Sequence, residues 1–137
     1  MSPDERRRRR SSDPLVALHY QLSSTRSRGE LDAIVIADAS GVVVAGAGSW
    51  PVCEELAAYA PLLAEGAWGS MTDQVSSRVD ALRDQVAVRT LVVGGQEVLL
   101  CARRQRPIAG IEAKDAANGF IDEAAAGITR ILEAAAA

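Results

Sequence analysis

The side chains in this sequence that could act as a catalytic base or nucleophile are few and far apart. His19 is the only histidine, and the two cysteines are Cys53 and Cys101. A nucleophile needs a base within hydrogen-bonding reach, and a zinc site needs closely spaced His and Cys ligands. His19 lies beside an apolar helical stripe with no second histidine or nearby thiol, so the sequence predicts no catalytic pair and no metal site.

Cys53 has a specific route to reactivity. It falls near the start of a predicted helix, where the positive end of the helix dipole lowers the pKa of a thiol. We favour the alternative, a small buried apolar residue. The chain starts with charged residues and lacks the apolar core of a signal peptide or a run of about 18 apolar residues. We therefore expect a cytoplasmic protein in which Cys53 and Cys101 are reduced. A disulfide between them is the alternative that the sequence does not exclude.

Carboxylates, serines and the one lysine offer weaker chemistry. Asp32 and Asp38 flank the first predicted strand, and paired carboxylates can act as acid and base. These two straddle a strand and a turn, which favours turn hydrogen bonds for Asp38 and surface charge for Asp32. Ser40 and Ser49 are typical of turns or helix caps, and we expect Lys114 to be a surface charge.

Sequence motifs for nucleotides and metals are missing. There is no P-loop, no dinucleotide-binding fingerprint and no zinc-ligand spacing, and Gly46-Ala47-Gly48 is too short to cradle a phosphate. We therefore predict that the protein is not an enzyme and has no catalytic, cofactor-binding or metal-binding residues.

The first half of the chain contains a predicted tight β-hairpin. The apolar runs Ala33–Ala37 and Val42–Ala45 favour extended backbone, and Asp38-Ala39-Ser40-Gly41 between them is typical of a turn. Gly41 can adopt the positive φ that such turns need. Both runs are continuous rather than alternating, which indicates strands buried on both faces or a face covered by another subunit. A loop at Gly46–Ser49 is expected next.

Helices are expected on either side of this hairpin. Asp13-Pro14 is typical of a helix start, and an apolar stripe follows before the polar cluster Ser23–Gly29. A second helix is predicted from Pro51, with one apolar face formed by Val52, Leu56, Tyr59, Leu62 and Leu63. Pro61 predicts a kink or break near Tyr59. Another amphipathic pattern begins at Ser70, so one broken helix and two consecutive helices both fit.

The second half predicts another hairpin and a last helix. Val86–Val93 and Glu97–Arg103 are strands by composition, joined by a Gly-Gly turn. Val88, Thr90 and Val92 alternate with residues of the other face. Pro107–Glu112 is a weak fifth strand, and Asn118–Glu133 is an amphipathic helix before a frayed end at residues 134–137.

The composition fits one domain with tails. The chain has 137 residues, 48% hydrophobic and only 4% aromatic, so small aliphatic side chains must fill the core. We expect a domain over residues 13–133 and a disordered Arg-rich tail over residues 1–12. Arg6 to Arg10 could contact nucleic acid, contact an anionic membrane, or be solvated. Without that run, the rest of the chain has a net charge more negative than the −3 of the whole chain. This negative charge argues against nucleic-acid binding by the folded body.

These elements predict an α+β fold. Strands joined by tight turns require an antiparallel sheet, and helices before, between and after them are expected to cover one face. The sheet has five strands, or four if Pro107–Glu112 does not pair.

In this order of elements the chain resembles the roadblock/dynein light chain family. The likeness is carried by the first hairpin, the helix with Glu54-Glu55-Leu56-Ala57-Ala58-Tyr59, and the strand pair Val88–Val93 and Glu97–Ala102. It implies a profilin-like, five-stranded antiparallel sheet flanked by helices. It also implies homodimers, or heterodimers with a relative, that regulate or scaffold a small Ras-like GTPase without catalytic residues of their own.

Two hypotheses about function follow. The first is a dimeric interaction module whose self-association surface we place on six residues: Leu56, Tyr59, Leu63, Val88, Thr90 and Val92. The second is a profilin-like sensor domain, of the PAS or GAF type, that binds a small ligand between sheet and helices. Such a pocket needs convergent polar or aromatic groups, and few candidates exist beyond Tyr59, Trp68 and Thr90.

Overall fold

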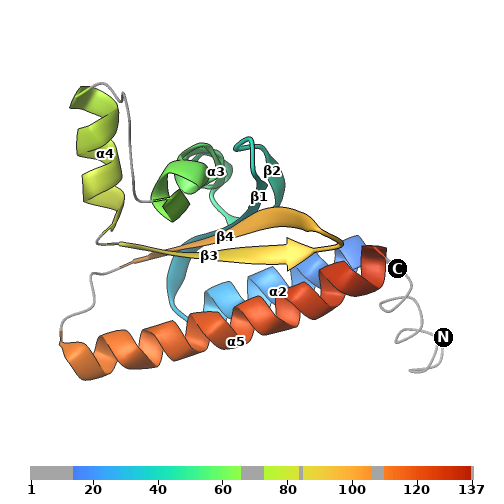
Figure 1. Ribbon diagram of the computed structural model, residues 1–137. Helices are drawn as coiled ribbons and strands as arrows, with labels where there is room; N and C mark the ends of the chain where they lie inside the picture. The colour runs from blue at the N-terminus through green and yellow to red at the C-terminus, as the bar shows by residue number, and fades with distance from the viewer. Residues whose placement is uncertain (1–13, 66–72, 84, 106–109, 137) are drawn as a thin grey trace.

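Four strands form one antiparallel sheet with helices on both faces (Figure 1). The computed structural model describes residues 14–65, 73–83, 85–105 and 110–136. The strands lie in the order β2-β1-β4-β3, with these bounds: β1, Leu31–Asp38; β2, Val43–Gly48; β3, Val86–Val93; β4, Gln96–Arg104. The helices of the described residues have these bounds: α2, Pro14–Arg28; α3, Trp50–Glu65; α4, Asp73–Arg83; α5, Ile111–Ala136. The predicted α+β class is confirmed.

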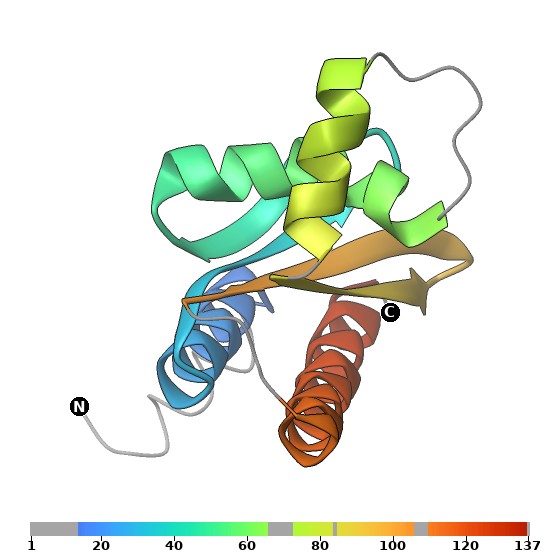
Figure 2. The same ribbon diagram turned by 90° about the vertical axis from the view of Figure 1, so that its left-hand side faces the viewer.

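The central strand β1 explains why both faces of the sheet carry helices. Ile34 and Ile36 are fully buried on one face, and Val35 is fully buried on the other. A strand that is apolar on both sides needs a cover on each. The expectation that the helices cover one face is therefore wrong: α2 and α5 lie on one side, and α3 and α4 on the other (Figure 2).

Each face has its own hydrophobic core. The α2/α5-side core contains Leu18, Leu22, Leu31, Ile34, Ile36, Ala45, Leu91, Leu100, Ala102, Ile121, Ala125 and Ile128. The α3-side core contains Ala33, Val35, Ala37, Cys53, Leu56, Ala57, Ala60, Leu82, Leu99 and Cys101. The α3-side core is built mainly from small side chains, so α3 lies close to the sheet.

The first hairpin forms as predicted, and its turn is held by one aspartate. Asp38 Oδ1 accepts hydrogen bonds from Ser40 N (2.9 Å), Ser40 Oγ (2.6 Å) and Val42 N (3.0 Å). Gly41 has φ of 89° and donates its N–H to the Asp38 carbonyl. The predicted loop at Gly46–Ser49 is wrong over its first three residues, because β2 continues to Gly48 and pairs with β1 there. A Cβ at Gly48 would lie 2.6 Å from the Asp32 carbonyl, so the glycine permits this close pairing.

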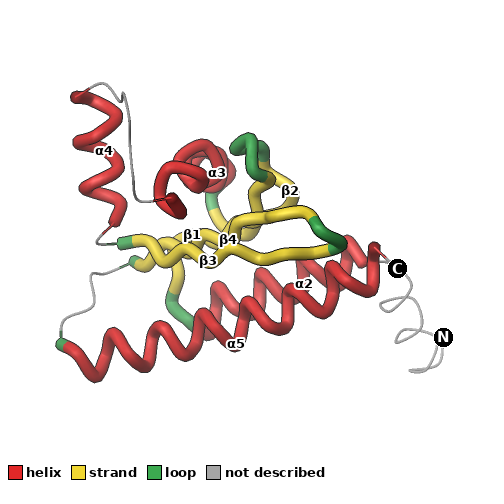
Figure 3. Tube along the Cα trace, viewed as in Figure 1, coloured by secondary structure: helices red, strands yellow, loops and turns green. Residues whose placement is uncertain are grey.

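The helix after the hairpin is continuous through its proline. α3 runs from Trp50 to Glu65 with Pro61 inside it, so the expected break near Tyr59 does not occur. α4 is a separate helix in the tube view (Figure 3). Trp68, which we considered for a ligand pocket, lies outside the described residues.

The last helix is longer than expected at both ends. α5 begins at Ile111 rather than near Asn118 and extends to Ala136, so residues 134–136 are helical where we expected fraying. The final residues of the predicted fifth strand, Ile111 and Glu112, form the first helical turn instead, where an acidic side chain suits the helix dipole. Within the described residues the sheet has four strands. Residues 106–109 and the tail with Arg6 to Arg10 lie outside the described part of the chain.

Candidate functional site

The residues that could have formed a nucleophilic site are kept apart. Cys53 and Cys101 are free and buried in the α3-side core, whereas His19 is exposed on α2, across the sheet. Burial raises the pKa of Cys101 to about 12. Burial also raises the pKa of Cys53, although Cys53 lies in the first turn of α3. Desolvation therefore outweighs the opposing effects of Arg26 and of the hydrogen bond to the Ala47 carbonyl, and the buried apolar interpretation is confirmed.

The two aspartates also have separate roles. Asp38 is fixed in the turn after β1, and the Ser40 hydroxyl, followed by the Val42 N–H, lowers the pKa of its carboxyl. Asp32 lies at the other end of β1, where its Oδ2 is 3.5 Å from Arg103 Nε and its carbonyl accepts from Arg26 Nε at 3.1 Å. The structure therefore brings no acid–base pair together from these residues.

The described residues offer neither a cluster of metal ligands nor a helix that could span a membrane. Residues 14–65, 73–83, 85–105 and 110–136 contain no cluster of three His, Cys, Asp or Glu side chains that could hold a metal ion. In the same part of the chain, no helix has the length and apolar character needed to cross a bilayer.

The residues predicted for self-association lie on the α3 side of the sheet but differ in exposure. Leu56 is fully buried in the α3-side core, so its own subunit covers it. Tyr59, Leu63 and Val88 are half-buried against that core. Val92 is 57% exposed. Thr90 is exposed as well. The fully accessible members of the set are therefore Thr90 and Val92, in the second half of β3. Tyr59 and Leu63 are only partly accessible.

The backbone of β3 offers an open hydrogen-bonding edge. The Arg104 N–H donates to the Gln85 carbonyl at 3.0 Å, which marks this facing pair as hydrogen-bonded. Hydrogen-bonded and non-hydrogen-bonded pairs alternate along an antiparallel ladder. By this alternation, the N–H and C=O groups of Val88, Thr90 and Val92 point away from β4. No described strand pairs with that side of β3.

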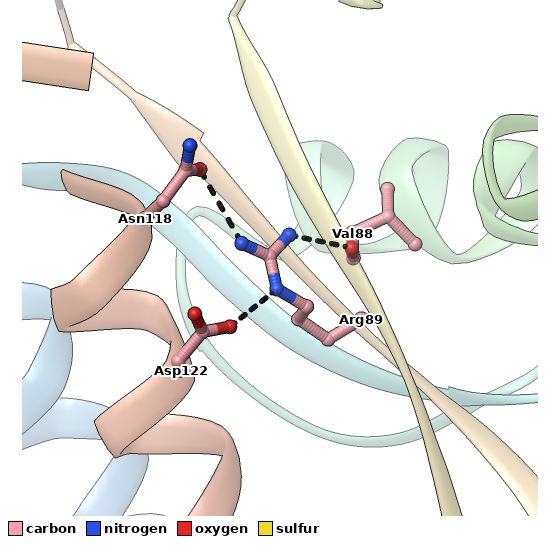
Figure 4. A network of polar contacts seen from close by, with 4 residues as sticks. All are labelled: Val88, Arg89, Asn118 and Asp122. Atoms are coloured by element: carbon pink, nitrogen blue, oxygen red, sulfur yellow. Dashed lines mark hydrogen bonds and ion pairs between the residues drawn. The ribbon is translucent and has the colours of Figure 1, made fainter. Parts of the chain in front are cut away.

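One outward carbonyl on this edge already has a partner. Arg89 Nη1 donates to the Val88 carbonyl at 2.9 Å, while Nε donates to Asp122 Oδ1 at 2.7 Å and Nη2 to Asn118 Oδ1 at 3.3 Å (Figure 4). The guanidinium thus joins the edge of β3 to the side of α5. Our sequence analysis missed this role, although a charged residue alternating with apolar ones on an edge strand was a usable signal.

The opposite edge of the sheet is also apolar but less regular. Val42 and Val44 are exposed near the start of β2. The pairing shifts between Ile36 and Ala37, which face Ala45 and Val43, so Val44 is the extra residue of a β-bulge. A bulge interrupts the ladder and bends the strand. This edge is consequently a poorer template for another strand than β3.

A cavity of about 520 Å³ opens on the α2/α5 side. It lies between the α2–β1 turn, the end of β4 and the first half of α5, and Arg28, Leu31, Arg104, Ala117 and Phe120 are among its lining residues. The Arg28 guanidinium lies over the Phe120 ring, 5.8 Å from its centroid. Our sequence analysis did not identify this cavity, because its walls come from segments far apart in the chain.

Comparison with solved structures reveals a known fold. The chain is similar to Myxococcus xanthus MglB, with a TM-score of 0.51 and 14% identity over 88% of this chain and 98% of that chain. The resemblance to the roadblock/dynein light chain family therefore holds at the level of the fold. No model of a known protein family matches the chain, and no curated protein matches it.

Proposed function

We propose that this chain is a non-catalytic interaction module that self-associates through the β3 edge, as a homodimer or as a heterodimer with a relative. The observation that carries the proposal is the open side of β3, with outward backbone groups at Thr90 and Val92 and an exposed Val92 side chain. Strand edges of this kind pair readily with a further strand. Thr90 and Val92 form the centre of the proposed contact, with Val88, Tyr59 and Leu63 at its border.

We further propose that the assembled module regulates or scaffolds a small Ras-like GTPase in the cytoplasm. The fold shared with Myxococcus xanthus MglB supports this role. Bacterial proteins of the roadblock kind often partner such GTPases. In this proposal the protein acts through its surfaces and not through catalytic groups. The position of His19, across the sheet from Cys53 and Cys101, agrees with this.

The oligomeric state is the first test. We expect light scattering coupled to size-exclusion chromatography to give the mass of a dimer at tens of micromolar protein. Val92→Lys should raise the dimer dissociation constant about tenfold or more, because it places like charges across the paired edges. Val42→Lys is the matched control, since Val42 is 59% exposed but lies next to the other edge strand. A wild-type monomer, or equal effects of the two variants, would count against the proposal.

The GTPase role needs a separate test. The Ras-like GTPase encoded nearest to this chain would be purified and loaded with GDP or with a non-hydrolysable GTP analogue. We expect calorimetry to show binding that depends on the nucleotide, and we expect the dimer-disrupting Val92→Lys to weaken it. Binding that is absent with both nucleotides would remove this half of the proposal and leave self-association standing.

A small-ligand sensor is the second candidate function, and the cavity near Arg28 and Arg104 favours it. Its volume of about 520 Å³ is within the range of roughly 300–1,000 Å³ that small-molecule pockets occupy. Tyr59 and Thr90, which we had considered for such a pocket, lie on the opposite side of the sheet.

A further inference from the structure

The cavity on the α2/α5 side combines a positive rim with an apolar wall. Arg28 and Arg104 belong to its lining, and so does the acidic residue Glu30. The apolar wall is formed by Leu31, Phe120 and Ile121. These charges leave the lining with an excess of one positive charge. A pocket with this distribution suits a ligand with an anionic group at one end and an apolar body.

Arg104 lacks a counter-charge in the described part of the chain. Its Nη2 atom is closed to solvent and has no hydrogen-bond partner there, and none of the ion pairs between described residues includes it. The residues beside it differ: Arg103 faces Asp32 across the sheet, and Arg89 is bound by Asp122. A cation that is partly removed from water without an anion is costly.

The surroundings of Arg104 make the positive potential stronger. Burial and then the positive charge of Arg89 lower the pKa of the Arg104 guanidinium, which shows that its neighbours disfavour the charge rather than compensate it. Arginine nevertheless remains charged near neutral pH. An anion held in the cavity would offset both effects.

Packing fixes the aromatic wall of the cavity. A Cβ added at Gly29 would lie 2.5 Å from Phe120 Cε1, so the ring lies directly against the backbone of the α2–β1 turn. Arg28 covers the same ring. The Phe120 ring is therefore held from two sides.

We infer that this cavity is a binding site for a small organic anion with an apolar body, a carboxylate or a phosphate ester. Arg104 and Arg28 bind the anionic group, and Leu31, Phe120 and Ile121 contact the apolar body. The site faces α2 and α5, whereas the proposed self-association uses the outer edge of β3. The inference rests on the second candidate function, the small-ligand sensor, and its test is independent of the proposed self-association.

Four probes separate head group from body. Octanoate, octyl phosphate, octan-1-ol and inorganic phosphate would be titrated into full-length ¹⁵N-labelled protein, with NMR shifts followed at Gly29, Gln105 and Ala117. We expect saturable shifts with octanoate or octyl phosphate, and the tighter of the two identifies the head group. Equal binding of octan-1-ol overturns the need for an anion, and equal binding of inorganic phosphate overturns the need for an apolar body. No saturable shift with any probe overturns the site.

Two variants attack the site by different routes. Arg104→Gln removes the unpaired charge and Ala117→Leu fills the space, and each should weaken binding of the better probe about tenfold. The matched control Arg78→Gln removes an arginine from α4, on the other side of the sheet, and should leave the affinity unchanged. Unchanged affinity in Arg104→Gln would overturn the inference.

Thermal unfolding without ligand distinguishes a ligand-binding arginine from a structural one. Because Arg104 Nη2 has no hydrogen-bond partner and the side chain has no ion pair among the described residues, Arg104→Gln should keep or raise the melting temperature of the free protein. The gain in melting temperature on adding the better probe should be lost in the same variant. A large fall in the melting temperature of the free variant would instead assign Arg104 a structural role.

Discussion

The strands β1 and β3 belong to the same sheet but differ in almost every physical respect. β1 has a hydrogen-bonded neighbour on each side, and the side chains of Ile34, Val35 and Ile36 are fully buried. Among the described strands β3 pairs with β4 alone, and Thr90 and Val92 are exposed. Burial of this kind supplies most of the stability of a domain. Stability is therefore concentrated at the centre of the sheet, and the rim is where we propose that the chain associates.

The edge strand is nevertheless controlled rather than simply left open. Arg89 occupies the outward carbonyl of Val88 while Asp122 and Asn118 hold its guanidinium. Charged groups on an edge are a common means of limiting unwanted strand pairing. The open part of β3 is therefore the segment beyond Arg89, around Thr90 and Val92. A partner strand could therefore pair only in registers that use the Thr90–Val92 end of β3.

The largest difference should be in the free energy of unfolding when one side chain of each strand is shortened to alanine. Ile36→Ala removes a fully buried side chain and should lower the free energy of unfolding by about 2–5 kcal/mol. Val92→Ala changes an exposed side chain and should cost less than about 0.5 kcal/mol. Urea unfolding followed by circular dichroism measures both. A loss in Val92→Ala as large as in Ile36→Ala would contradict the division between centre and rim.

Alkaline pH probes the buried face next to β1. Cys101 pairs with Val35 across the sheet, and burial raises the pKa of its thiol from 9.0 to about 12. The unfolded chain therefore loses this proton before the native protein does. The stability linked to the thiol is complete below pH 9.0 and declines as the pH rises toward the native pKa.

This loss should reach at most about 1.4 kcal/mol for each pH unit. Unfolding of the wild type under reducing conditions between neutral and alkaline pH measures it. Cys101→Ala is the comparison, because it lacks the titrating group and should show a shallower decline. Parallel curves for the two proteins would mean that the thiol is accessible in the native state.

Removing Arg89 should have a smaller effect on stability than on association. The pair with Asp122 is partly solvent-exposed, so Arg89→Ala should cost only about 0.5–1 kcal/mol. Losing the guanidinium also frees the Val88 carbonyl, so the dimer dissociation constant should fall. Arg130→Ala on α5 is the control. Weaker association in Arg89→Ala than in Arg130→Ala would show that Arg89 belongs to the contact rather than restricting it.

The turn after β1 should give the smallest effect. Hydrogen bonds from Ser40 and Val42 hold the pKa of Asp38 below 3.8. The depressed pKa means that its stabilising effect is present above 3.8 and is lost as the pH falls through the native value. Asp38→Asn should therefore reduce the difference in stability between neutral and acidic solution. A difference identical to that of the wild type would show that the turn does not depend on the carboxylate charge.

Local chemistry determined much of what the sequence predicted. The turn at Asp38 and Gly41, the Gly-Gly hairpin and the burial of Cys53 all follow from short-range preferences. Our predictions failed where local preferences and pairing compete. Gly46 to Gly48 has the composition of a loop, yet this segment pairs with β1. Pro61 is unfavourable inside a helix, yet α3 continues through it because the apolar face of the helix packs on the sheet.

The candidate sites needed information that no local window contains. The cavity joins Arg28, Leu31, Arg104 and Phe120 from four elements or turns, and the edge of β3 is open only because of the strand order. By itself, the sequence determined most of the strands and helices and that the continuous apolar run Ala33–Ala37 requires cover. Only the tertiary structure decided that this cover comes from both sides, and, among the described residues, which edge is free and which arginine lacks a counter-charge. These properties depend on distances between residues far apart in the chain, and backbone preferences do not specify such distances.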